Sequence, residues 1–300
     1  LHNVDKRLDW LYPVDLNDDG QDDLVACFYD SLVPTGKDTT AIIILENVGG
    51  NHFESRDTIG MDNGRFLVRI GDYLGNGKAQ LLLMPVLTNP LIPWTFSRLI
   101  HHDGNTFQKA NSYTIFNNVR DVATGDFDGD GRVEVLVVKD NGSAVYSLNL
   151  SNNVVTYDNC FSTSDINHSE RWNHVFTGDF NGDGKTDLLY NDKLGNLSRW
   201  RFFYSTGVAF VPTERISSIY CSLPEYNAYS NSLRKVIDVM NLPNNWTGDY
   251  CSVCTADFDG DGVTDVATSQ MTSFSSNIDV YFHYLPSVNK FQSFFSGSTT

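Results

Sequence analysis

Oxygen-bearing side chains recur at fixed places in a nine-residue loop that the chain contains five times. Loops one to five start at Asp15, Asp72, Asp126, Asp179 and Asp257. Except in loop two, Asp or Asn stands at positions 1, 3 and 5, Asp or Glu stands at position 9, and Gly stands at position 6. Ca²⁺ prefers about six to eight oxygen ligands, and glycine permits the sharp turn that brings them together. The spacing predicts calcium in four loops.

The predicted ligands are the side chains at positions 1, 3, 5 and 9 and the main-chain carbonyl at position 7, where the residue type varies freely. They are Asp15, Asn17, Asp19, Gln21 and Asp23; Asp126, Asp128, Asp130, Arg132 and Glu134; Asp179, Asn181, Asp183, Lys185 and Asp187; and Asp257, Asp259, Asp261, Val263 and Asp265. Loop two departs from this pattern, because Leu74 takes position 3 and Asn76 and Gln80 replace two carboxylates. We expect no calcium there. The alternative for the other loops is an acidic turn without metal.

The formal charge of the 300-residue chain is −16, from 21 basic and 37 acidic residues. Four calcium ions add +8 and leave −16 + 8 = −8, so the loops account for much of the acidity. An acidic chain without a basic cluster argues against nucleic acid or an anionic membrane surface as partner. No apolar run reaches the roughly 18 residues that cross a bilayer, so membrane insertion is not expected.

The chain opens Leu1-His2-Asn3 without Met, so we expect a processed form or a piece of a longer polypeptide. Cys251 and Cys254 lie on an expected strand, where residues three apart face opposite sides. A buried thiol or a disulfide to Cys221 is therefore favoured over zinc or redox chemistry. Calcium sites of this kind suit extracellular concentrations, so we expect a secreted or cell-surface protein.

Successive loops start 57, 54, 53 and 78 residues apart, and each interval reads as four strands. A period near 54 residues carried by strands and turns is typical of a β-propeller. We predict an all-β fold in one domain, 1–300, of about five four-stranded blades with a calcium loop between the first and second strands. The blades are expected at about 8–57, 66–113, 119–161, 173–214 and 249–295. The long fourth interval holds an insertion, 216–248, with a possible short helix at 232–240.

Position 2 of every loop is large and apolar although the loop is polar: Leu16, Tyr73, Phe127, Phe180 or Phe258. The residue before each loop is small or slim: Val14, Gly71, Gly125, Gly178 or Ala256. Both features suit an innermost strand near a central axis, with the apolar residue held between adjacent sheets.

The stretches Gly-Asp-Phe-Asp-Gly-Asp-Gly-Arg-Val-Glu (125–134), Gly-Asp-Phe-Asn-Gly-Asp-Gly-Lys-Thr-Asp (178–187) and Ala-Asp-Phe-Asp-Gly-Asp-Gly-Val-Thr-Asp (256–265) resemble FG-GAP/VCBS repeats. Those repeats are known from integrin α-subunit propellers and many secreted bacterial proteins. The resemblance covers about 8–295 and implies a propeller whose loops bind Ca²⁺. A weaker likeness is to the propeller of toxin-complex B and Rhs-like polypeptides, although no Rhs repeat occurs in the chain.

The longer connecting segments are expected on the face opposite the calcium loops, at 30–40, 88–95, 159–172 and 216–248. Long loops gathered on a rigid scaffold are a usual place for binding. The candidate ligand contacts there are Trp94, Trp172, Tyr226, Tyr229 and Trp246, which could equally be aromatics that cover the blade ends.

The function favoured by the sequence is a calcium-stabilised binding or adhesion propeller with a carbohydrate or a protein as ligand. One alternative is a structural module of a larger toxin or surface polypeptide. An enzyme, either a lyase or an oxidoreductase built on a propeller, is a further alternative, but the sequence has no Gly-x-Ser-x-Gly, no His-Glu-x-x-His and no Gly-rich phosphate loop. We predict no catalytic residues.

Overall fold

The structure is a computed structural model of the chain. It describes residues 7–32, 37–50, 52–62, 65–86, 97–114, 116, 119–139, 142–166, 175–194, 197–213, 250–258, 260–271, 277–285 and 290–299. Strands and their connections make up these segments, and they contain no helix. No helix with the length and apolar character of a membrane span is therefore found in the described part.

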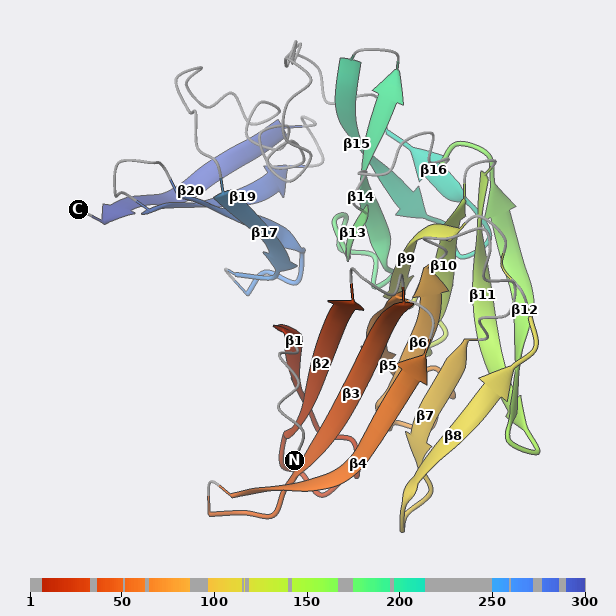
Figure 1. The fold of residues 1–300 in the computed structure, drawn as a ribbon. Helices are drawn as coiled ribbons and strands as arrows, with labels where there is room; N and C mark the ends of the chain where they lie inside the picture. Colours follow the sequence, from red (N-terminus) through yellow and green to blue (C-terminus); the bar gives the residue numbers. More distant parts are fainter. Residues whose placement is uncertain are drawn as a thin grey trace. The chain divides into compact units, whose positions relative to one another are not determined.

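The described strands fall into sets of four that follow one another along the chain (Figure 1). The first set is β1 (Arg7–Val14), β2 (Asp23–Leu32), β3 (Lys37–Asn47) and β4 (Phe53–Asp62). The second is β5 (Arg65–Gly71), β6 (Gln80–Val86), β7 (Arg98–His102) and β8 (Phe107–Ser112). The third is β9 (Val119–Gly125), β10 (Glu134–Lys139), β11 (Gly142–Ser151) and β12 (Val154–Thr163). The fourth is β13 (Val175–Gly178), β14 (Asp187–Leu194), β15 (Leu197–Ser205) and β16 (Phe210–Pro212), and the fifth is β17 (Tyr250–Ala256), β18 (Asp265–Met271), β19 (Asn277–Leu285) and β20 (Lys290–Thr299).

Within each set, every strand is hydrogen-bonded to its sequence neighbours in chain order. The second and third sets also share one sheet, because β8 and β12 pair in parallel over a short stretch, with Val154 opposite Asn111 and Val155 opposite Ser112. The four strands predicted for each interval are thus confirmed. The turn predicted at Asn152-Asn153 is confirmed as well, since both residues have positive φ, 50° and 61°, as tight hairpins require.

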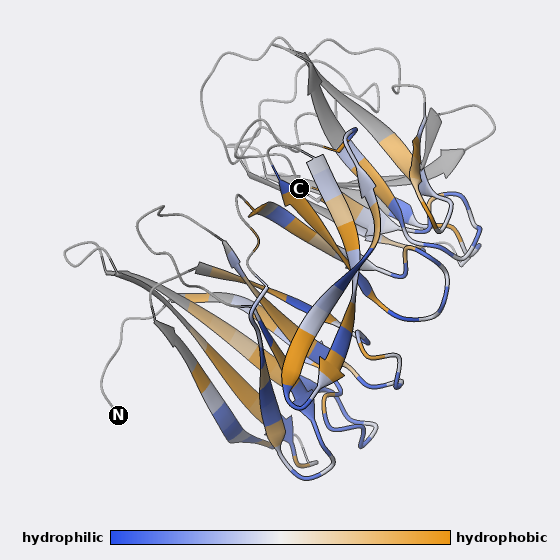
Figure 2. Ribbon diagram, turned by 90° about the vertical axis from the view of Figure 1, so that its right-hand side faces the viewer, coloured by the Kyte–Doolittle hydropathy of each residue, from blue (hydrophilic) through white to orange (hydrophobic). Residues whose placement is uncertain are grey.

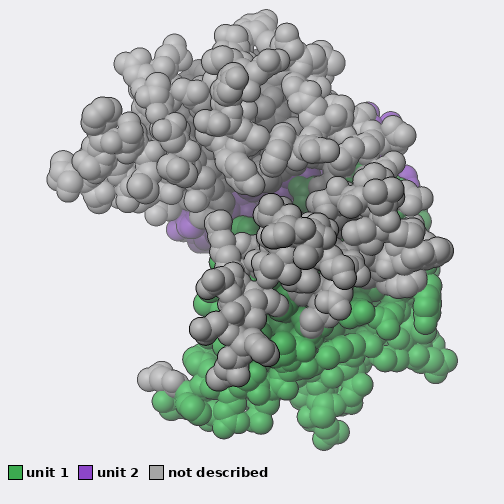
Figure 3. Space-filling model, in the orientation of Figure 1, with its two compact units in different colours: residues 1–124, 131–139, 145–160 green, residues 125–130, 140–144, 161–300 purple. Residues whose placement is uncertain are grey.

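The structure divides into two compact units (Figure 3). Unit 1 comprises 1–124, 131–139 and 145–160, and unit 2 comprises 125–130, 140–144 and 161–300. The blade boundaries and the single domain of 1–300 stay predictions. The insertion 216–248 with its possible helix lies outside the described residues.

Unit 1 is held together by two apolar clusters on opposite faces of β6. Leu81 and Leu83 belong to one cluster and Leu82 and Met84 to the other, and all four side chains are fully buried. Because successive side chains of a strand point to opposite faces, a sheet covered on both sides requires such a continuous apolar run. Hydrophobic residues accordingly run along the strands, while the connecting loops are hydrophilic (Figure 2).

Unit 2 has an aromatic core. Phe127 and Phe210 meet edge to face with ring centroids 5.5 Å apart, and Phe210 meets Phe161 at 5.1 Å. Phe180 packs on Phe202 at 4.9 Å. Such pairs add roughly 0.5–1.5 kcal/mol each beyond the area that they bury.

The prediction that position 2 of each loop is buried is confirmed in four loops, where Leu16, Tyr73, Phe127 and Phe180 are at most 2% exposed. It is wrong for loop five, because Phe258 is 39% exposed. Phe127 is covered by Phe210 of the following set of strands, and no described set follows the fifth.

Candidate metal centre

Each acidic loop joins the first strand of a set to the second, and position 9 is the first residue of the second strand. Asp23, Gln80, Glu134, Asp187 and Asp265 occupy this position and are at most 1% exposed. A buried carboxylate at the start of a core strand has to be hydrogen-bonded or paired with a charge. The strand therefore holds one end of the loop inside the protein.

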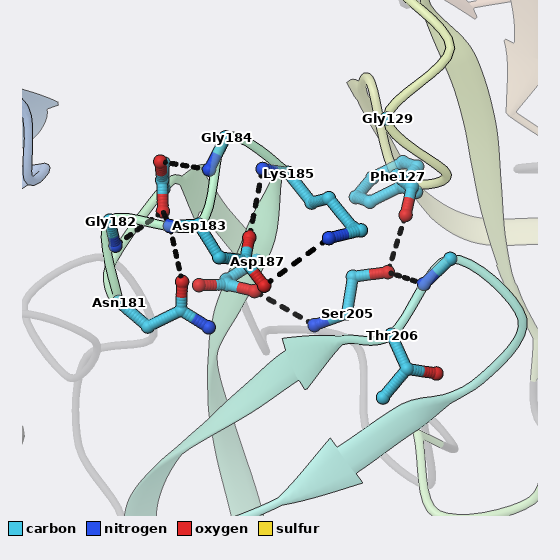
Figure 4. Close-up of polar contacts among 12 residues, drawn as sticks. Phe127, Gly129, Asn181, Gly182, Asp183, Gly184, Lys185, Asp187, Ser205 and Thr206 are labelled. Atoms are coloured by element: carbon cyan, nitrogen blue, oxygen red, sulfur yellow. Dashed lines mark hydrogen bonds and ion pairs between the residues drawn. The ribbon is translucent and has the colours of Figure 1, made fainter.

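The position-1 carboxylate organises the backbone of the loop. In loop four, Oδ1 of Asp179 accepts the N–H groups of Gly182 (2.7 Å) and Asp183 (3.1 Å), and Oδ2 accepts that of Gly184 (2.8 Å; Figure 4). Asp15 accepts the corresponding N–H groups of loop one at 2.7, 3.2 and 2.8 Å. Asp257 does so in loop five at 2.7, 3.2 and 2.9 Å. The loops thus share one backbone conformation.

Two positions of this conformation are left-handed. Gly184 at position 6 has φ +83°, as the sequence predicts, and Gly182 at position 4 has φ +76°. The requirement at position 4 was not predicted, although Gly stands there in four of the five loops. In loop one Asp18 takes this conformation with φ 67°, which Asp tolerates better than most residues.

The position-9 carboxylate is fixed from two sides. Oδ2 of Asp187 accepts the N–H of Phe180 at 3.1 Å. Oδ1 of Asp187 accepts the N–H of Ser205, at the end of β15, at 2.8 Å (Figure 4). Asp23 is held in the same way by the N–H groups of Leu16 at 3.2 Å and Asn47 at 2.9 Å. The third-strand partners Ser205 and Asn47 were not predicted, and no signal in the sequence marks them.

The pKa of Asp187 is raised to about 7, chiefly by burial and also by the charges of Asp183 and Asp179, although the N–H groups of Ser205 and Phe180 act in the opposite direction. Burial likewise raises the pKa of Asp23, with Asp19 and Glu46 contributing. These carboxylates are costly to ionise where they lie, because they are desolvated and close to like charges. A cation among them would favour the ionised form.

The oxygens at positions 1, 3 and 5 converge. In loop three, Asp126, Asp128 and Asp130 each place a carboxylate oxygen within 4.8 Å of the others. In loop four, Asn181 at position 3 accepts the N–H of Asp183 at 2.9 Å, and Asp183 accepts the N–H of Lys185 at 2.9 Å. In loop five, Asp259 lies outside the described residues. This donor set of carboxylate and amide oxygens fits a hard cation such as Ca²⁺.

The side chains at position 7 contact the preceding loop. Lys78 pairs with Asp18 at 3.2 Å, and Arg132 and Lys185 cover Gly75 and Gly129, the position-4 residues of loops two and three. Val263 covers Gly182. The sequence predicted only the carbonyl at position 7 as functional, because these side chains differ too much in chemistry to reveal a shared place.

Neighbouring loops are also joined through their main chains. The N–H at position 8 donates to the carbonyl oxygen at position 1 of the preceding loop: Val133 to Asp72 at 2.9 Å, Thr186 to Asp126 at 2.7 Å and Thr264 to Asp179 at 2.7 Å. Glycine before each of these acceptors makes the approach possible. A Cβ on Gly71 would lie 2.8 Å from Cγ1 of Val133.

The predicted ligand contacts Trp94, Trp172, Tyr226, Tyr229 and Trp246 all lie outside the described residues. They stay predictions, as does the assignment of calcium to the loops.

Residues 126–190, from the start of loop three to the fourth residue of β14, match the family model of the FG-GAP-like repeat. The chain carries an FG-GAP-like repeat. The resemblance to FG-GAP repeats inferred from the sequence is thereby confirmed. No curated protein matches the chain.

A solved structure with a similar fold is that of a lectin. A lectin from Agrocybe aegerita, in a structure of its specific recognition of non-reducing terminal N-acetylglucosamine, is 17% identical with a TM-score of 0.58. The match covers 96% of this chain and 65% of the lectin chain, so this chain spans about two thirds of the lectin's length. The biofilm matrix protein Bap1 of V. cholerae gives 15% identity and a TM-score of 0.37 over 98% of this chain and 42% of that one.

Proposed function

We propose that the chain is a calcium-stabilised β-propeller of five four-stranded blades, 1–300, that binds an extracellular ligand. This architecture is supported by the sets of four consecutive strands, by the two apolar clusters on opposite faces of β6 and by the FG-GAP-like repeat. The hydrogen bonds from position 8 of one loop to position 1 of the loop before it also support it, because they join consecutive strand sets at corresponding places.

Calcium is proposed in loops one, three, four and five. The side chains at positions 1, 3, 5 and 9 and the carbonyl at position 7 would hold it. Calcium would supply positive charge among buried carboxylates, and its role here is structural. The observation that carries the proposal is Asp187, a fully buried carboxylate near two further carboxylates, Asp179 and Asp183. A cation offsets such a repulsion.

The proposed activity is binding and not catalysis, with a carbohydrate or a protein as ligand. Carbohydrate is the first class to test, because the lectin of similar fold recognises terminal N-acetylglucosamine. The binding face is proposed opposite the calcium loops, with Trp94, Trp172, Tyr226, Tyr229 and Trp246 as contacts. Aromatic rings provide the flat apolar surface on which a sugar ring or a protein side chain can pack. An extracellular or cell-surface location follows from such a role.

A glycan array probed in calcium tests this function. We expect binding to a defined set of glycans and its loss in Trp94→Ala and Trp246→Ala variants that keep the melting temperature of the wild type. A matched pair of variants on the other face, Asp22→Ala and Lys78→Ala, should bind normally. An array without bound glycans would contradict the carbohydrate proposal, and loss of binding in the second pair alone would place the site on the calcium-loop face.

A further inference from the structure

Loop two keeps the conformation of its neighbours without their acidic residues. Asp72 accepts the N–H groups of Asn76 at 3.0 Å and Gly77 at 2.7 Å, and Gly75 and Gly77 have φ of +64° and +77°. Something in this loop therefore stands in for the missing carboxylates. The side chain of Gln80 at position 9, which is 1% exposed, is the residue to examine.

The amide oxygen of Gln80 takes the place of a carboxylate oxygen. Oε1 accepts the N–H of Tyr73 at position 2 at 2.8 Å and that of Leu74 at 3.2 Å. In loop four the same N–H, from Phe180, is accepted by Oδ2 of Asp187 at 3.1 Å. The buried N–H at position 2 is thus satisfied in both loops, by an uncharged group in one and a charged group in the other.

The amide nitrogen of Gln80 has no counterpart in the other loops. Nε2 donates to Oδ1 of Asn76 at 3.1 Å and to the carbonyl oxygen of Lys78 at 2.5 Å. These are the oxygens at positions 5 and 7, which in the other loops are assigned to calcium. Two N–H donors of one amide thereby link these two oxygens, and Oδ1 of Asn76 also accepts the N–H of Lys78 at 3.1 Å.

The residue at position 3, Leu74, also fits a loop that needs no ion. Leu74 offers no side-chain oxygen and packs against the second apolar cluster of unit 1. Asp72 is the one carboxylate of loop two, so no cluster of negative charge has to be offset. A neutral donor is then sufficient where the other loops require a divalent cation.

We propose that loop two is stabilised without calcium, by the side-chain amide of Gln80 in the role that the ion has in the other loops. The proposal rests on the calcium sites proposed above for those loops. Stabilisation by this amide makes the connection between β5 and β6 insensitive to calcium removal.

Two variants test this proposal by melting temperature and by the number of bound calcium ions. Gln80→Met keeps the length of the side chain and removes its hydrogen bonds, so it should melt several degrees below wild type, equally in calcium and in chelator. Leu74→Asp/Gln80→Glu recreates the acidic side chains of loop three at positions 3 and 9 and keeps the amide oxygen of Asn76 at position 5. It should melt below wild type in chelator, recover in calcium, and bind one ion more than wild type.

The proposal is overturned if Gln80→Met melts like wild type in chelator, if the double variant purified in calcium gains no ion, or if Asp72→Asn lowers the number of ions that wild type binds. Failure of the underlying calcium proposal is distinguishable. In that case wild type binds no calcium and melts identically with and without chelator, while the melting of Gln80→Met in chelator still reports on the amide.

Discussion

Asp183→Asn separates the two roles of the position-5 carboxylate, as a hydrogen-bond acceptor and as a negatively charged calcium ligand. Asp183 accepts the N–H of Lys185 at 2.9 Å. An Asn side chain can make the same bond, because Asn76 accepts the N–H of Lys78 at 3.1 Å at this position of loop two. The substitution therefore keeps the turn and removes one negative charge from loop four.

The loss of stability that we expect for Asp183→Asn in the presence of calcium follows from ligand linkage. An ion present at about a hundredfold excess over its Kd stabilises the folded state by about 2.7 kcal/mol. Exchange of a charged ligand for a neutral amide oxygen is expected to cost about the hundredfold in affinity seen at the upper end for outer-sphere partners, which leaves about 0.4 kcal/mol. The difference of about 2.3 kcal/mol corresponds to roughly 4 °C, with an unfolding entropy of about 2.1 cal/mol/K for each of 300 residues.

In chelator, we expect Asp183→Asn to have the opposite effect on the melting temperature. The charge of Asp183 raises the pKa of the buried Asp187, so the two carboxylates repel each other in the calcium-free loop. Asp183→Asn removes this repulsion and should melt at or above the wild-type temperature. Differential scanning calorimetry in calcium and in EGTA measures both arms.

Asp103→Asn is the matched control, since the exposed Asp103 accepts the N–H groups of Asn105 and Thr106 in a turn outside the calcium loops. It should shift the melting temperature equally under both conditions. If Asp183→Asn behaves like this control, then Asp183 acts only in the turn and the reasoning about loop four is refuted.

Three further outcomes are expected. Removal of calcium from wild type should cost about 11 kcal/mol for four independent sites, which is comparable with the roughly 5–15 kcal/mol stability of a typical domain. Chelator should therefore lower the melting temperature by more than 10 °C, and an unchanged calorimetric trace would contradict this. Without calcium, the free energy of unfolding should fall as pH rises from about 3.8 to about 7, because folded Asp187 keeps its proton over that range while the unfolded chain releases it. Urea titrations in EGTA that show this free energy rising over the same range would contradict the raised pKa of Asp187. Gly71→Ala should destabilise the folded protein by about 1–3 kcal/mol, since its Cβ would lie 2.8 Å from Cγ1 of Val133. Adding Val133→Ala to this variant should restore part of the loss, and purely additive effects of the two substitutions in urea unfolding would argue against the contact.

The strands and the backbone of the loops could be predicted because both depend on local rules. Glycine at position 6 and oxygen side chains two residues apart are requirements of one short turn, and they repeat in register. The run from Leu81 to Met84 reads as a strand buried on both faces for the same reason. Such patterns survive in the sequence because each copy meets its requirement with its own residues.

The contacts between loops could not be predicted, because each is made by residues more than 50 positions apart and of no fixed type. Lys78 meets Asp18 as an ion pair, whereas Val263 meets Gly182 by apolar contact at the corresponding place. The main-chain bond from Thr186 to Asp126 uses atoms that every residue but proline possesses. Only the small residue before each loop hinted at a close approach, and it did not name the partner.

One peptide group connects the chemistry of adjacent loops. The carbonyl of Lys185 at position 7 is assigned to the cation of loop four, and the N–H of the same peptide group, on Thr186, donates to the carbonyl oxygen of Asp126. A cation on that carbonyl would polarise the peptide and strengthen its N–H as a donor. Asp126 is itself the position-1 residue that organises loop three. The order that an ion would impose on one loop would therefore reach the residue that shapes the loop before it, and the same hydrogen bond recurs from Thr264 to Asp179.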